Sequence, residues 1–94
     1  MTASGEVLRL LIARTASVMG VDPSSVTSAS RFDEDLHADS LDLVEVMDGM
    51  ERDLRERGER VRLSDQELVG LRTVGEAAER IAAGTSGQGE AGTR

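Results

Sequence analysis

The segment 33–42 holds the few side chains of this sequence that could do chemistry. Ser40 carries a hydroxyl, His37 an imidazole and Asp39 a carboxylate, all within four residues. A serine in this setting can cap a helix, act as a nucleophile, or serve as the point where a phosphate-linked group is attached. The function of the protein depends on which of these three roles Ser40 has.

A serine hydrolase is the first chemistry to consider, because serine, histidine and aspartate are its catalytic set. A working triad needs a histidine that bonds the serine and is itself held by a buried carboxylate, together with an oxyanion hole. Residues this close on one loop rarely meet all three demands, and the chain has no second histidine. The Gly-x-Ser-x-Gly motif is absent as well. We therefore interpret His37 as a loop residue without chemistry and predict no catalytic site.

A metal site is the second chemistry to consider, because acidic side chains alternate along the same segment. The alternating residues are Asp33, Asp35, His37 and Asp39. A calcium loop needs glycine at its sixth position and glutamate at its twelfth. Counted from Asp33, these positions hold Ala38 and Val44. The pattern fails, so we predict no metal site and interpret the acidic run as a solvated loop that complements the N-terminus of the following helix.

Composition restricts the partners. The 94 residues make one small domain, without cysteine and with Phe32 as the single aromatic residue. The net charge of −7 argues against binding to nucleic acid and favours binding to a partner with a basic docking patch. The apolar residues 7–13 are interrupted by Arg9 and fall far short of the roughly 20 that a membrane span needs. No basic segment precedes them, so they do not match a signal peptide. We expect a cytoplasmic monomer that does not bind membranes.

Hydrophobic periodicity predicts an all-α fold, a small four-helix bundle with three main helices and one short helix. The main helices are expected at residues 4–19, from 39 or 40 to 57, and at 73–83, and the short helix at Ser64, where a capping box begins. Residues 26–38 keep no period and form a long loop between the first two helices, a kind of segment that tends to be functional. Residues 1–83 would form the bundle, and residues 84–94 a disordered tail.

The same periodicity predicts the core. The inward positions are Val7, Leu8, Leu11, Ile12, Thr15 and Val18 in the first helix, Val46, Met47, Met50 and Leu54 in the second, and Val74, Ala77, Ala78 and Ile81 in the last. Phe32 and Leu36 are expected to pin the loop onto the bundle, and the charged residues 55–60 to be solvated. No sequence pattern explains Gly49, which should cost about 1 kcal/mol relative to alanine inside a helix.

Covalent attachment remains for Ser40. A helix N-terminus favours a negatively charged group, so a phosphodiester on the Ser40 hydroxyl would be stabilised there. Taken alone, Asp39-Ser40-Leu41 is better explained as a helix cap. The surrounding residues 26–45, however, resemble the acyl carrier protein family without a gap, and residues 71–77 are similar to the start of that family's last helix. The resemblance extends over residues 6–83.

The resemblance implies a carrier without catalytic activity. Ser40 would carry 4′-phosphopantetheine, donated from coenzyme A by a magnesium-dependent phosphopantetheinyl transferase, and the thiol of this arm would hold acyl groups as thioesters. The helix after Ser40 would dock onto basic patches of acyl-transferring or ketosynthase-type enzymes. The residues that the family match assigns to recognition are Asp39, Leu41, Asp42, Val44, Glu45 and Asp48.

Three departures from the family pattern bear on the pathway. His37 stands where fatty-acid carriers commonly have glycine, Asp48 stands at a position that is often apolar, and about five extra residues lie within 54–63. They favour a carrier for polyketide or other specialised biosynthesis. A discrete peptidyl or aminoacyl carrier, a housekeeping fatty-acid carrier and an unmodified helical adaptor stay open as alternatives.

Overall fold

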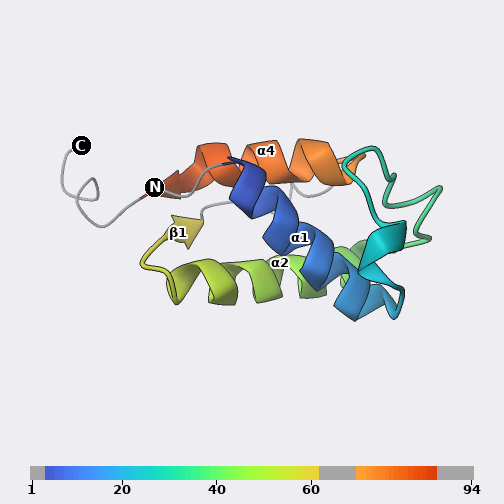
Figure 1. Ribbon diagram of the computed structural model, residues 1–94, viewed down its shortest axis with the longest axis horizontal. Coiled ribbons are helices and arrows are strands. Elements are labelled where there is room, and N and C mark those ends of the chain that lie inside the picture. The colour runs from blue at the N-terminus through green and yellow to red at the C-terminus, as the bar shows by residue number, and fades with distance from the viewer. Residues whose placement is uncertain (1–3, 62–69, 87–94) are drawn as a thin grey trace.

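The computed structural model describes residues 4–61 and 70–86. Within this part of the chain three α-helices form the bulk of the fold, and a short 3-10 helix and two short strands accompany them (Figure 1). The elements are α1 (Ser4–Met19), η1 (Pro23–Ser25), α2 (Ser40–Arg55), β1 (Arg60–Val61), α4 (Val74–Gly84) and β2 (Thr85–Ser86). The predicted all-α class is confirmed, whereas the predicted short helix at Ser64 lies outside the described residues.

Helix α1 has the predicted bounds and ends in a glycine-based cap. Gly20 has a φ of +72°, the left-handed conformation that glycine adopts without steric cost. The N–H of Val21 then donates to the carbonyl of Ala16 at 3.0 Å, the pairing of a Schellman motif. The chain leaves α1 at a fixed angle as a result, and it continues into η1, whose cap is the Asp22 side chain. Hydrogen bonds from Ser24 hold the pKa of Asp22 below the usual aspartate value of 3.8.

Helix α1 packs against both α2 and α4 and so forms the centre of the described bundle. In Figure 1 it crosses in front of the other two helices, which run in the same direction across the view. All the inward positions predicted for α2 and α4 are buried, as are Val7, Leu11 and Thr15 of α1. Leu8, Ile12 and Val18 are only partly buried and pack at the edge of this core. The periodicity therefore identified the core face of each helix.

The segment between α1 and α2 is attached to the beginning of α4. The N–H of Phe32 donates to the carbonyl of Arg72 at 2.9 Å, and Arg31 and Thr73 form an isolated β-bridge. Phe32 is buried and Leu36 is partly buried against the core, so both pin the segment as predicted. At Gly75 a Cβ atom would lie 3.0 Å from the carbonyl oxygen of Ser28, which shows how closely the two backbones approach. These contacts fix the point at which the chain enters α2.

The charged segment at the end of α2 differs from the prediction at one residue. We expected residues 55–60 to be solvated, but Glu59 is only 6 % exposed, and Arg57 forms an ion pair with Glu6 of α1. Gly58, with a φ of +84°, turns the chain so that it returns across the end of the bundle. The other charged residues of the segment are exposed as predicted, so the prediction was wrong for Glu59 alone.

The first residues of the segment predicted to be a disordered tail belong to regular structure. Helix α4 extends to Gly84, and Thr85–Ser86 forms β2, which pairs antiparallel with β1. In the register, Arg60 lies opposite Ser86 and Val61 opposite Thr85. Backbone pairing with β1 does not depend on apolar side chains, so the Gly, Ser and Thr composition of this stretch concealed it. Residues 87–94 lie outside the described part of the chain.

Candidate functional site

Ser40 is the first residue of α2, and its neighbour Asp39 caps the helix. Asp39 has an extended backbone, and its Oδ1 accepts a hydrogen bond from the N–H of Asp42 at 2.9 Å. In return, Oδ2 of Asp42 accepts from the N–H of Asp39 at 3.1 Å, so the two aspartates form a reciprocal capping box. Capping is therefore supplied by Asp39 and Asp42, and the hydroxyl of Ser40 is not needed for it.

The start of α2 offers both an accessible hydroxyl and open hydrogen-bond donors. Ser40 is exposed, and the next side chain, Leu41, is 74 % exposed. Within the described residues the N–H groups of Ser40 and Leu41 donate no hydrogen bond, as is usual in the first turn of a helix. A hydroxyl beside open N–H donors at the positive end of a helix dipole is well placed to hold a negatively charged substituent.

The loop before Ser40 is a series of tight turns closed by its own backbone. The N–H of Ala38 donates to the carbonyl of Phe32 at 2.7 Å, and the N–H of His37 donates to that of Asp33 at 3.2 Å. His37 takes a φ of +57°, a left-handed conformation that non-glycine residues adopt only at a steric cost. The backbone at position 37 therefore has the conformation that glycine would adopt most easily.

The side chains expected to be without catalytic or metal chemistry have local roles. No hydrogen bond joins His37 to Ser40 among the described residues, and the imidazole is exposed. The Asp35 carboxylate accepts from the N–H of Arg31 at 2.8 Å, and the Asp33 carboxylate accepts from the N–H of Glu34 at 2.7 Å. In the part of the chain that the structure covers, no three acidic, histidine or cysteine side chains gather in a way that could hold a metal ion. The acidic run shapes its own loop.

The six residues assigned to recognition fall into two groups. Leu41, Val44, Glu45 and Asp48 are exposed along one side of α2. The carboxylates of Asp39 and Asp42 are engaged in the capping box, and Asp42 is half-buried. The structure thus brings four of the six onto one accessible surface beside Ser40, and gives the other two a structural role at the beginning of the helix.

Comparison with known proteins identifies the family of this site. Residues 9–81 match the family described as "Phosphopantetheine attachment site". The chain is also 38 % identical over 76 residues to the acyl carrier protein of Rubrobacter xylanophilus, an alignment that covers 81 % of this chain and 88 % of that protein. The chain belongs to the acyl carrier protein family. The cofactor is accordingly 4′-phosphopantetheine, which such carriers bear covalently.

The residues at the start of α2 fit this cofactor. A covalently bound phosphodiester needs a solvent-accessible hydroxyl that is not covered by apolar side chains. Ser40 and Leu41 are both exposed, so this condition is met. The open N–H groups of the first turn suit the negative charge of the phosphodiester.

The helices of the described part are too short and too polar to cross a membrane.

Sequence reasoning missed two features of this carrier. The first is a link between helices, in which Nη2 of Arg14 donates to both carboxylate oxygens of Asp53 at 2.9 and 3.0 Å. The Arg14 side chain passes over Gly49, where a Cβ atom would lie only 2.4 Å from its Cδ. This explains the glycine in the middle of α2, because any larger residue would displace the arginine. In the sequence, the only indication of this link was a glycine one helical turn before an aspartate, Gly49 before Asp53.

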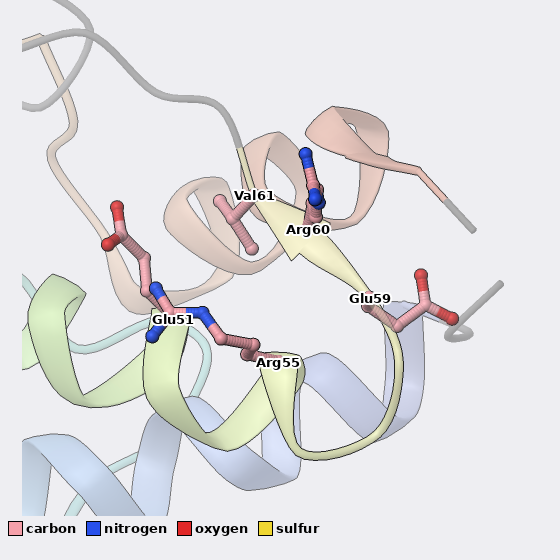
Figure 2. Close-up of a pocket in the computed structure, with 5 residues that line it drawn as sticks. All are labelled: Glu51, Arg55, Glu59, Arg60 and Val61. Carbon is pink, nitrogen blue, oxygen red and sulfur yellow. The ribbon is translucent and has the colours of Figure 1, made fainter. Parts of the chain in front are cut away.

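The second missed feature is a hollow at the other end of α2 (Figure 2). It has a volume of about 370 Å³ and is lined by Glu51, Arg55, Glu59, Arg60 and Val61. In Figure 2, Arg55 extends along α2 toward Glu51, and Arg60 projects from β1. The hollow lies more than ten residues along the helix from Ser40, which is about 15 Å or more at the rise of an α-helix. It is therefore separate from the site at Ser40.

Proposed function

We propose that Ser40 is the attachment residue for the 4′-phosphopantetheine arm. The observation that carries this proposal is the division of roles at the start of α2. Asp39 caps the helix through Asp42, and this leaves the exposed hydroxyl of Ser40 free for modification. The bound arm supplies a terminal thiol, which this cysteine-free chain lacks, for holding acyl groups as thioesters.

The chain's own residues would hold and present the arm. The hydroxyl of Ser40 anchors the phosphate, and the N–H groups of Ser40 and Leu41 provide donors where that charge is favoured. Backbone hydrogen bonds between residues 28–32 and residues 72–75, at the start of α4, keep the anchor at one corner of the bundle. In this proposal the protein carries and presents its cargo, and partner enzymes do the chemistry.

Loading by a phosphopantetheinyl transferase tests the proposal. We expect intact-mass measurement to show one added arm after incubation with coenzyme A, magnesium and a broad-specificity transferase. Ser40→Ala should remain unmodified. Ser17→Ala is the matched control, because Ser17 is also an exposed helical serine, and it should load like the wild type. If the wild type stays unmodified while a known carrier in the same tube is loaded, the protein is a helical adaptor instead.

We also propose that partner enzymes dock on the exposed side of α2 beside Ser40. Leu41 and Val44 offer apolar contact, and Glu45 and Asp48 offer negative charge to a basic patch. Exposed charge pairs are individually weak and are screened by salt. Weak docking suits a carrier that must leave each enzyme quickly. Asp39 and Asp42 would influence docking through the cap, as positioning residues.

For the pathway, we propose polyketide or other specialised biosynthesis. Three features support this choice over a housekeeping fatty-acid carrier: the left-handed His37 in the loop, the exposed charge of Asp48, and the ribbon of β1 and β2 at the end of the extended segment after α2. Mass analysis of the acyl-loaded protein from its host tests it. Polyketide-type acyl groups are expected; a saturated fatty acyl ladder or an aminoacyl group would assign the protein to fatty-acid or peptide biosynthesis.

A further inference from the structure

The exposed ridge of α2 changes the sign of its charge halfway along the helix. The ridge consists of residues spaced by three or four, which places them on one side of a helix: Leu41, Glu45, Asp48, Arg52 and Arg55. All five are exposed. From the Ser40 end, the ridge reads apolar, then acidic for about one turn, then basic for about one turn. Glu51 and Glu56 lie on its two flanks.

The basic end of the ridge has no ion-pair partner within the described residues. Arg14, Arg31 and Arg57 each form an ion pair with a carboxylate. Arg52 and Arg55 form none there, and neither does the exposed Arg60 on β1. The chain carries 18 acidic residues against 11 basic ones, so partners are plentiful. Leaving these arginines unpaired keeps their charge available to another molecule.

Hydrogen bonding at the end of the helix does not require these arginines. Basic residues often occupy the last turn of a helix because they complement its dipole. Here, however, three of the last four carbonyls, those of Arg52, Leu54 and Arg55, already accept hydrogen bonds from backbone N–H groups in the following turn. Arg60 lies beyond the helix altogether and yet lines the same hollow as Arg55. The basic charge therefore extends over two elements around the hollow in Figure 2, which Glu51 and Glu59 also line.

We infer that the partner enzyme is contacted by both halves of the ridge, with an acidic patch of the enzyme on Arg52 and Arg55. This rests on the proposed function, in which Glu45 and Asp48 meet basic residues beside the enzyme's active-site entrance. At 1.5 Å per residue, Arg52 lies about 18 Å along the helix from Ser40, so the acidic patch lies at about that distance from the entrance. Opposite charges at the two ends allow only one direction of α2 on the enzyme surface, and this directs the arm at Ser40 toward the entrance.

Charge reversal at the basic end tests this inference. The arm-loaded R52E/R55E variant is compared with the wild type as substrate for a purified acyltransferase or condensing enzyme of the source organism, with kcat/KM measured across ionic strength. The matched control is R9E/R72E, which makes the same change in net charge at exposed positions outside α2. Intact mass first establishes that every protein is loaded, and circular dichroism that each is folded.

The two modes of docking predict opposite signs. With docking at both ends, R52E/R55E loses about tenfold in kcat/KM at low salt, mainly through KM, and the difference shrinks as salt is added. The control stays near the wild type. With docking by the acidic half alone, the added negative charge strengthens attraction to a basic enzyme, so kcat/KM stays equal or rises, and the inference is wrong. Failure of the wild type to take up the arm would instead contradict the proposed function.

Discussion

At the scale of single residues, position 37 shows how local backbone geometry limits the choice of side chain. His37 has a φ of +57° in the loop that leads to Ser40. The lack of periodicity in residues 26–38 predicted a loop, but not which residue in it takes the left-handed conformation. The reciprocal cap of Asp39 and Asp42 was only half predicted, since both were assigned to docking and only Asp39 was also expected at the helix cap. Short-range hydrogen bonds of this kind depend on rotamers that a residue pattern does not specify.

Substitution at position 37 should change stability according to backbone preference. A β-branched residue tolerates the left-handed conformation poorly, so His37→Val should lower the free energy of unfolding by about 1–2 kcal/mol. His37→Gly should leave it equal or slightly higher, because relief of strain outweighs or balances the added chain entropy. Urea unfolding measures both. If the valine variant is as stable as the wild type, the left-handed conformation of His37 does not hold in solution.

At the scale of elements, the three described helices follow from periodicity, and their connections do not. The apolar stripes of α1, α2 and α4 identified the buried faces because a 3.6-residue repeat survives in the sequence. The burial of Glu59 and the pairing of β1 with β2 were missed, since they depend on contacts between residues far apart in the chain. The link between Arg14 and Asp53 belongs to the same class of contact.

The Gly49–Arg14 contact predicts a substitution whose effect changes sign with its background. In an ordinary helix, glycine to alanine gains about 1 kcal/mol. Here Gly49→Ala places its Cβ against the Arg14 side chain and displaces it from Asp53, so we expect no gain or a loss. In the Arg14→Ala background the obstruction is gone, and the same change should stabilise by about 1 kcal/mol.

A double-mutant cycle by urea unfolding measures this coupling. It compares the wild type, the two single variants and the double variant. Asp53→Ala serves as a control that removes the ion pair and leaves Arg14 in place. Since the pair is partly exposed, its own contribution should stay within about 1 kcal/mol. Equal effects of Gly49→Ala in both backgrounds would show that the arginine does not pass over the glycine.

At the scale of the whole molecule, the excess of carboxylates affects both association with other molecules and the stability of the fold. The net charge of −7 on 94 residues favours association with basic surfaces. The same excess of carboxylates also causes repulsion between like charges within the folded protein. The composition alone predicted the first property. The composition does not show where the basic residues lie. That unpaired arginines gather at one end of α2 became known only from the ion pairs of the described residues.

Self-repulsion predicts that moderate salt stabilises the protein. Raising ionic strength from about 10 mM to about 150 mM shortens the Debye length from about 30 Å to about 8 Å and weakens repulsion between exposed carboxylates. The melting temperature should therefore rise by a few degrees, with sodium and potassium chloride giving equal shifts. A fall over this range would mean that the ion pairs, which salt also screens, outweigh the repulsion.

The passage of Arg14 over Gly49 has a consequence for natural variation among related carriers. The two positions are 35 residues apart in the chain, yet they share one volume in the folded protein. A long side chain at position 14 requires the smallest residue at position 49, and a short one removes that requirement. Positions 14 and 49 should therefore vary together through evolution. In related carriers, the position that varies together with a glycine inside a helix would identify the residue of the facing helix that crosses it.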